Sequence, residues 1–142
     1  MGVSGWMADF GEALPFDAVL HGEVSAADYH NRYPEVWAQL NREVIQESGL
    51  EGEVAFFMRS GFTQAPTHAT LFWLGDQLTS WRAEDGIKNA VTGLLSSGMS
   101  GFSLNHSDIG GYIATTLPHV PFPLSSVGHS RSRELLWHWI EL

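Results

Sequence analysis

Four short apolar segments, each closing on an ionisable or polar residue, limit what this chain can fold into. The segments and their closing residues are 3–9 with Asp9, 53–59 with Arg59, 70–76 with Asp76, and 101–108 with Asp108. Near-continuous apolar strands are typical of a parallel sheet that is covered on both faces. The four segments therefore predict buried parallel strands that carry their polar groups at one edge of the sheet.

Helical patterns lie between and after these strands. Apolar residues recur at three- and four-residue steps in two stretches, Ala26 to Glu47 and Asp85 to Ser97. We expect their buried stripes to contain Tyr29, Tyr33, Val36, Trp37, Leu40, Val44 and Ile45 in the first helix, and Ile87, Ala90, Val91, Leu94 and Leu95 in the second. A further helix begins near Arg133, after a loop at residues 117–132. Strands alternating with helices predict an α/β fold.

The α/β pattern leaves two architectures open, a (β/α)8 barrel and a doubly wound sheet. Both place functional groups at the carboxyl ends of parallel strands. A complete barrel needs roughly 250 residues, and this chain has 142. If the fold is a barrel, we expect these residues to be an interior segment of a larger protein.

Charge and composition narrow the classes of partner. The formal net charge is −9, and no cluster of Lys and Arg is present to bind a phosphate backbone, so nucleic acid is an unsuitable partner. No apolar run approaches the roughly 20 residues that cross a membrane. The chain has no cysteine, which excludes disulfides and fits a cytoplasmic location.

Asp9 and Asp76 are the main candidates for catalysis because both close strands and lie far apart in the chain. Two carboxylates that converge over one pocket can perform glycoside hydrolysis, with one as nucleophile or base and the other as acid. The alternative is that each Asp caps a helix or forms a turn. The whole interpretation requires the two side chains to meet across one sugar-sized gap.

Other polar strand ends have weaker assignments. Arg59 could bind a hydroxyl or an anionic substituent, or form an ion pair with a neighbouring Asp. His106 and Asp108 lie two positions apart on a strand and point the same way, which suits hydrogen bonds to a polyol. Further ligands at metal-site spacing are missing, so no metal is expected. Trp73 lies near a strand end, where it could stack on a sugar or pack in the core.

Four motifs, in this order, resemble glycoside hydrolase family 31, and in particular its sulfoquinovosidase branch. They are Met7-Ala-Asp-Phe-Gly-Glu-Ala-Leu-Pro15, Arg59-Ser-Gly-Phe62, Leu71-Phe-Trp-Leu-Gly-Asp-Gln77 and His106-Ser-Asp-Ile-Gly-Gly-Tyr112. The resemblance covers nearly the whole chain. It implies a partial TIM (β/α)8 barrel, about strands 4 to 7 with their helices, with residues 1–142 as part of a single catalytic domain.

The resemblance also implies a retaining glycosidase without a metal or organic cofactor. Asp9 matches the family nucleophile, and Glu12 matches the acidic residue that accompanies it. Asp76 matches the general acid/base. Arg59 matches the arginine of the Arg-Ser-x-Phe motif near the substrate. His106 and Asp108 match the polar end of the seventh strand.

Departures from typical α-glucosidase motifs indicate the sulfoquinovosidase branch. This chain has Asp9-Phe-Gly-Glu12 in place of Asp-Met-Asn-Glu, and Gly75-Asp76-Gln77 in place of Gly-Asp-Asn. Tyr112 matches a tyrosine that holds the sulfonate in that branch, and we expect Gln77 and Trp73 to contribute to the substrate site. The expected partner is a small glycoside with an anionic sulfonate.

Two rival interpretations stay open at the level of sequence. One is an α-glucosidase or α-xylosidase of the same family, and the other is a sugar-binding or structural fragment without catalysis. A barrel segment alone leaves strand edges and apolar surface uncovered, so the isolated chain is expected to be inactive. The sequence leaves oligomerisation and the aglycone open.

Overall fold

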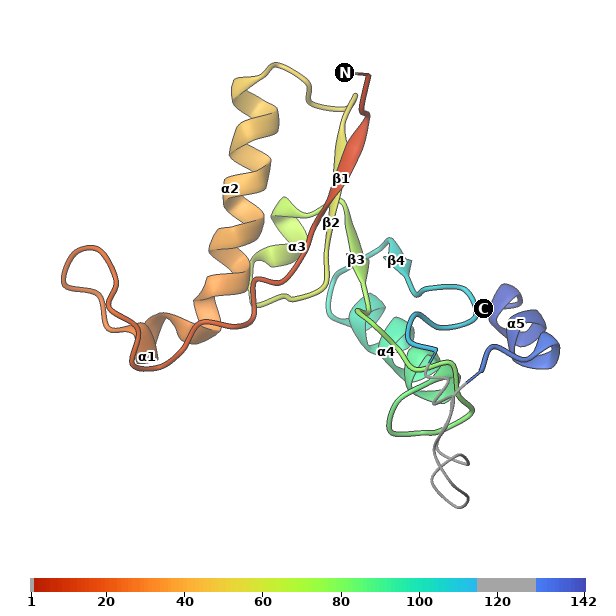
Figure 1. The fold of residues 1–142 in the computed structure, drawn as a ribbon. Helices are drawn as coiled ribbons and strands as arrows, with labels where there is room; N and C mark the ends of the chain where they lie inside the picture. Colours follow the sequence, from red (N-terminus) through yellow and green to blue (C-terminus); the bar gives the residue numbers. More distant parts are fainter. Residues whose placement is uncertain (1, 115–129) are drawn as a thin grey trace. The chain divides into compact units, whose positions relative to one another are not determined.

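A computed structural model describes residues 2–114 and 130–142 (Figure 1). Its elements are β1 (Gly5–Ala8), α1 (Ala26–Tyr29), the 3-10 turn η1 (His30–Arg32), α2 (Tyr33–Glu47), β2 (Ala55–Met58), α3 (Ala65–His68), β3 (Leu71–Trp73), α4 (Ile87–Met99), β4 (Asn105–His106) and α5 (Arg133–Ile140). The chain divides into two compact units, one of residues 1–73 with 101–104 and one of residues 74–100 with 105–142.

The strands follow the order β1-β2-β3-β4, which confirms the predicted α/β class with a parallel sheet. In the first unit β1 pairs in parallel with β2, and β2 pairs in parallel with β3. The N–H of Phe72 donates to the carbonyl of Leu104 in that unit. In the second unit the N–H of Leu74 donates to the carbonyl of His106.

The core of the first unit lies between its strands and α2. In Figure 1, α2 runs alongside β1 and β2, which it connects. The cluster of buried side chains contains Ala8, Ala38, Ile45, Phe56, Met58, Ala65, Ala69 and Phe102. On α2 the buried positions are Pro34, Ala38, Asn41 and Ile45, which recur at steps of three and four as one helix face requires.

The helix predicted over residues 26–47 is divided into α1, η1 and α2. Pro34 lies in the first turn of α2, where its missing N–H costs no hydrogen bond and its fixed φ favours a helix start. Ser25 caps α1, because its hydroxyl accepts from the N–H of Asp28. The proline therefore sets a new beginning inside a stretch whose apolar periodicity is continuous.

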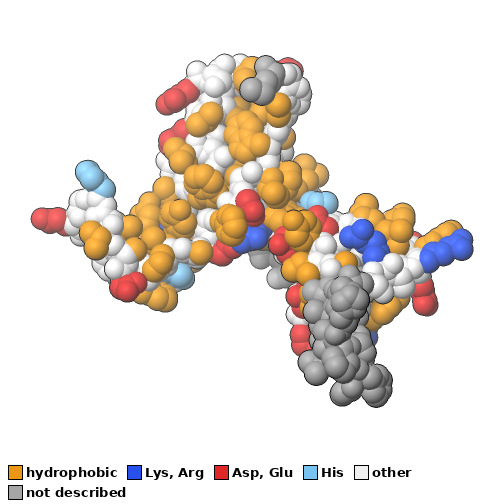
Figure 2. Space-filling model, viewed as in Figure 1, with side chains coloured by type: hydrophobic (Ala, Val, Ile, Leu, Met, Phe, Trp, Pro, Cys, Tyr) orange, Lys and Arg blue, Asp and Glu red, His pale blue; other side chains and the backbone are white. Residues whose placement is uncertain are grey.

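The buried stripes are narrower than predicted. Leu40 and Val44 on α2, and Val91 and Leu95 on α4, are exposed. Apolar side chains reach the surface over much of the view in Figure 2. Each helix buries one narrow seam in its own unit, and the apolar residues beside that seam stay at the surface.

The second unit has a small core in which α4 and α5 meet. Ile87, Ala90, Leu135 and Trp139 form it, and Leu74 packs against it. Ser132 caps α5 by accepting from the N–H of Leu135, as expected for a helix beginning near Arg133. Of the loop predicted at residues 117–132, positions 117–129 lie outside the described residues.

The chain holds no helix, within residues 2–114 and 130–142, that combines the length and apolar composition needed for a bilayer crossing.

Candidate active site

The register of β1 and β2 brings the first candidate residues together. Ala8 is the register partner of Met58. Asp9 follows Ala8 in the chain, and Arg59 follows Met58. Carboxyl ends of parallel strands open at the same edge of a sheet. Asp9 and Arg59 therefore leave their strands side by side, as the sequence pattern predicted.

Arg59 binds two carboxylates in the first unit. Its Nε lies 3.3 Å from Oδ1 of Asp9. Its Nε and Nη2 also donate to Oε1 of Glu12, over 2.9 Å and 2.5 Å. The ion pair that the sequence left open for Arg59 is thus present, and it joins the predicted nucleophile to its predicted companion. Charge-assisted contacts of this kind fix geometry more strongly than neutral ones do.

The turn after Asp9 has an unusual backbone. Phe10 adopts a positive φ of 61°, in the left-handed region that non-glycine residues rarely enter. Its N–H donates to Oδ1 of Asp9 over 2.9 Å. The guanidinium carbon of Arg59 lies 4.3 Å from the centre of the Phe10 ring, in a cation–π contact. The Asp9 side chain is 32% exposed, so it remains accessible within this cluster.

Asp76 lies on a loop of the second unit, directly after the buried Gly75. Gly75 has a φ of 79°, which suits the absence of a side chain. Asp76 is exposed, whereas the next residue, Gln77, is 5% exposed. The Gln77 amide nitrogen donates to the carbonyl of Leu74 over 2.7 Å. Its buried Oε1 has no hydrogen-bond partner among the residues that the structure describes.

Backbone pairing joins the Asp76 loop to the segment that carries Tyr112. The carbonyl of Gln77 accepts from the N–H groups of Tyr112 and Ile113, over 2.8 Å and 3.0 Å. Leu78 and Ile113 form an isolated parallel bridge. The Tyr112 residue is 60% exposed. The second unit therefore holds Asp76, Gln77 and Tyr112 on two adjoining segments.

His106 and Asp108 also lie in the second unit, at the end of β4. Nε2 of His106 lies 3.5 Å from Oδ1 of Asp108, a contact that is ionic when the imidazole is protonated. The two side chains are thus within contact distance of each other, and their predicted role in binding a polyol stays a prediction. Within the described ranges no three His, Cys, Asp or Glu residues are grouped to hold a metal ion.

Trp73 lies in the core of the first unit. It is 4% exposed, and its ring meets that of Phe57 edge to face with centroids 6.3 Å apart. The sequence left open whether Trp73 stacks on a sugar or packs in the core. The ring has the burial and aromatic contact of a residue packed in the core. A contact between Trp73 and substrate stays a prediction.

Comparison with known proteins identifies the fold. Residues 1–142 match the family described as the glycosyl hydrolases family 31 TIM-barrel domain. The chain belongs to glycoside hydrolase family 31. These matches confirm the predicted barrel rather than the doubly wound sheet, which was the other architecture that the sequence left open. The strand-end groups of this family 31 segment lie at the edge where barrel enzymes place their active sites.

Curated relatives of this family 31 chain include two sulfoquinovosidases. The chain is 45% identical over 141 residues to the sulfoquinovosidase of Escherichia coli, and 43% identical over 141 residues to that of Agrobacterium fabrum. These alignments cover 99% of this chain and 19% and 20% of the relatives. A probable glucan 1,3-alpha-glucosidase of Oryza sativa is 25% identical over 105 residues, which are 74% of this chain and 11% of that protein.

A solved structure has a similar fold. It is a family 31 sulfoquinovosidase from E. rectale in complex with an aza-sugar inhibitor, with a TM-score of 0.83 and 41% identity. The similarity covers 99% of this chain and 20% of that one. The chain thus spans about a fifth of the length of the sulfoquinovosidases it matches. The family match places residues 1–142 within the TIM-barrel domain of glycosyl hydrolases family 31.

The predicted site residues of this family 31 segment fall into two groups. Asp9, Glu12 and Arg59 are brought together in the first unit. The second unit holds Asp76, Gln77, His106, Asp108 and Tyr112. The meeting of Asp9 and Asp76 across one sugar-sized gap stays a prediction.

Two polar contacts of the segment that holds the predicted nucleophile were not predicted from the sequence. Trp37 and Ser60 donate to backbone carbonyls at the end of β1. Trp37 was assigned only to the buried stripe of its helix. Ser60 lies directly after Arg59. Its position next to a strand-end residue was the feature of the sequence that could have indicated a role at the site.

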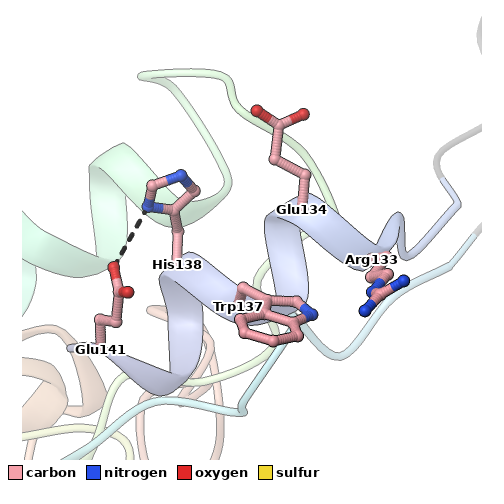
Figure 3. Close-up of a pocket in the computed structure, with 5 residues that line it drawn as sticks. All are labelled: Arg133, Glu134, Trp137, His138 and Glu141. Atoms are coloured by element: carbon pink, nitrogen blue, oxygen red, sulfur yellow. Dashed lines mark ion pairs between the residues drawn. The ribbon is translucent and has the colours of Figure 1, made fainter.

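A surface pocket on α5 lies apart from the strand-end residues of its unit. Arg133, Glu134, Trp137, His138 and Glu141 line it (Figure 3). His138 and Glu141 form an ion pair across 3.4 Å, and the guanidinium carbon of Arg133 lies 5.4 Å from the centre of the Trp137 ring. All five residues come from one helix and its C-terminal cap. The pocket contains none of the predicted catalytic residues.

Proposed function

We propose that this chain carries the nucleophile Asp9 and the acid/base Asp76 of a retaining α-glycosidase that acts on α-sulfoquinovosides. The observation that carries the proposal is the 45% identity to a sulfoquinovosidase over 141 residues. The predicted nucleophile also lies beside an arginine at the carboxyl end of a parallel strand. The complete enzyme would release sulfoquinovose from sulfoquinovosyl glycerol or a related sulfolipid glycoside.

The proposed reaction is a double displacement. A carboxylate oxygen of Asp9 attacks the anomeric carbon while the glycosidic carbon–oxygen bond breaks, and Asp76 gives its proton to the leaving oxygen. A glycosyl ester on Asp9 results. Asp76 then removes a proton from water, the water oxygen attacks the anomeric carbon, and the ester bond to Asp9 breaks. Two inversions give net retention. Retaining enzymes hold the two carboxyl groups about 5 Å apart.

Arg59 has a supporting role in this proposal. Its guanidinium already contacts Asp9 and Glu12. A group held between two carboxylates is suited to fixing the direction of the nucleophile. Glu12 completes this arrangement by accepting from two nitrogens of the same guanidinium.

The sulfonate part of the proposal rests on the relatives and on Tyr112. Both curated sulfoquinovosidases align over 99% of this chain. Tyr112 is exposed, and its phenol can donate a hydrogen bond to a sulfonate oxygen. Its backbone is tied to Gln77, one residue after the proposed acid/base.

The test uses the complete protein that contains this segment. We expect kcat/KM on 4-nitrophenyl α-sulfoquinovoside to exceed that on 4-nitrophenyl α-glucoside. The first product observed by NMR should be the α-anomer, and Asp9→Asn should abolish turnover. Substantial activity in Asp9→Asn would overturn the nucleophile assignment, and β-anomer as the first product would overturn retention.

A second candidate function is α-glucosidase activity, and one observation favours it. The relative from Oryza sativa is named as a probable glucan 1,3-alpha-glucosidase. Its identity of 25% over 105 residues is well below the 45% of the E. coli relative, so we rank it second. A preference for the α-glucoside in the same assay would reverse this order.

A further inference from the structure

Two side chains from different elements hold successive carbonyl groups after β1. The indole Nε1 of Trp37, on α2, donates to the carbonyl of Asp9 over 3.2 Å. The hydroxyl of Ser60, two residues after β2, donates to the carbonyl of Phe10 over 2.8 Å. The backbone of the proposed nucleophile is thus anchored from the helix and from the neighbouring strand.

The chain also has no room for a side chain between these two anchors. Gly11 is buried and has a φ of 90°. A Cβ at this position would lie 2.8 Å from Oγ of Ser60 and 2.8 Å from Cδ1 of Trp37. The preceding residue, Phe10, is held in the left-handed region at a φ of 61°. Residues in such a conformation persist only where the surrounding contacts determine them.

We propose that Trp37 and Ser60 are positioning residues, which set the direction of the Asp9 side chain by clamping the backbone of residues 9–11. This inference rests on the proposed role of Asp9 as nucleophile. The side-chain direction of Asp9 follows from its backbone, and Asp9 has left the regular pairing of β1. The two donated hydrogen bonds replace that pairing. A misplacement of about 1 Å at a reacting group can cost on the order of 100-fold in rate.

The same pair of elements offers a matched control. The indole of Trp6, on β1, donates to Oδ1 of Asn41, on α2, over 2.7 Å. Trp6 and Trp37 therefore each form an indole hydrogen bond that links α2 either to β1 or to the residue that follows β1. The Trp37 bond ends on the nucleophile segment, whereas the Trp6 bond ends on a helix side chain.

The experiment compares Trp37→Phe, Ser60→Ala and Trp6→Phe in the complete protein, on the better of the two 4-nitrophenyl substrates. We expect Trp37→Phe and Ser60→Ala to lower kcat by about 10- to 100-fold, with KM within about twofold. Trp6→Phe should keep kcat within about twofold while its Tm falls by an amount similar to that of Trp37→Phe. Ser60→Thr, which retains the hydroxyl, should recover most of the kcat lost in Ser60→Ala.

Two outcomes would overturn the positioning roles. One is a kcat within about twofold of wild type in both Trp37→Phe and Ser60→Ala. The other is an equal loss of kcat in Trp6→Phe, because general loosening between β1 and α2 would then explain the result. If Trp37→Phe does not fold, the kcat values of Ser60→Ala and Ser60→Thr test the positioning role. The proposed function fails separately, through an active Asp9→Asn variant.

Discussion

Arg59 Nε lies 3.3 Å from Oδ1 of Asp9, and the register of two parallel strands produces this contact. Ala8 and Met58 are register partners, so the next residue in each segment leaves the sheet at the same level. The guanidinium then also reaches Glu12, three residues farther along. The ends of one strand pair, together with the loop that follows β1, therefore bring a cation and two carboxylates together.

Replacing Arg59 by lysine should lower kcat/KM by about 100-fold. Lysine keeps the charge but lacks the planar fork that contacts Asp9 and Glu12 together, so the nucleophile loses its fixed direction. Arg42→Lys is the control, because Arg42 also lies over a phenylalanine ring but donates to the carbonyl of His68. Steady-state kinetics of both variants measure the difference. Equal losses in the two would show that Arg59 acts only in folding.

Asp76→Ala should show a strong dependence on the leaving group. On sulfoquinovosyl glycerol, kcat/KM should fall by about 100- to 10,000-fold, because an alkoxide needs a proton in order to leave. The loss on the 4-nitrophenyl glycoside should be far smaller, since 4-nitrophenolate leaves without one. Asp85→Ala is the control, because Asp85 accepts from the N–H of Leu78 in the same unit. A leaving-group dependence in Asp85→Ala, or none in Asp76→Ala, would contradict the acid assignment.

Gly11→Ala should destabilise the protein more than Gly22→Ala. Both glycines have a positive φ, 90° and 83°, so both substitutions carry backbone strain of about 1–2 kcal/mol. At Gly22 a Cβ meets nothing within 4 Å, whereas at Gly11 it meets Ser60 and Trp37 at 2.8 Å. We expect a total loss of about 2–5 kcal/mol for Gly11→Ala. Urea unfolding of the two variants measures it, and equal losses would mean that the clamp around Gly11 yields easily.

Trp139→Phe should lower the free energy of unfolding by about 1–3 kcal/mol. Trp139 is 2% exposed, and its indole donates to the hydroxyl of Ser107 over 2.9 Å, between His106 and Asp108. The substitution leaves a cavity and removes the donor. Trp137→Phe, on the same helix but 57% exposed, should stay within about 0.5 kcal/mol of wild type. Comparable effects at the two positions in urea unfolding would show that the packing around Trp139 is weak.

The isolated 142-residue chain should bind a hydrophobic dye strongly and show no glycosidase activity. Exposed apolar residues occur on α4 and α5, namely Val91, Leu95, Met99, Trp137 and Ile140. Large exposed apolar patches promote association and aggregation. Dye fluorescence, light scattering and thermal melting test this expectation. A cooperative melt of a monomer without dye binding would contradict it.

The sequence predicted the strand ends more reliably than the lengths of the elements. Periodicity and closing charges located Asp9 and Arg59 at neighbouring ends, because a parallel register depends on local pattern. The strand expected over residues 101–108 is reduced to Asn105–His106, since few of its backbone groups have a strand partner. The four-residue helix α3 was not predicted, because so short a stretch shows no periodicity.

Sequence patterns could not predict the contacts that support Asp9, and the reason differs from the one that applies to the lengths of the elements. Trp37 and Asp9 are 28 residues apart, and the indole bond depends on the rotation of α2 about its axis. Apolar periodicity places Trp37 on the packed face but does not show which atom it will meet. The widths of the buried stripes were wrong for the same reason, since Leu40 and Leu95 have apolar character but lie beside the seam that packs.

The pairing of one guanidinium with two carboxylates has an electrostatic consequence for an anionic substrate. The ion pairs of Arg59 set one formal positive charge against two formal negative charges, within a chain of formal net charge −9. For the anionic substrate proposed above, the charges of this segment would be repulsive, and dissolved salt would screen that repulsion over a Debye length of about 10 Å at 0.1 M. As far as this segment is concerned, long-range electrostatics would not attract the proposed anion, and hydrogen-bond donors that act at contact distance would have to select it.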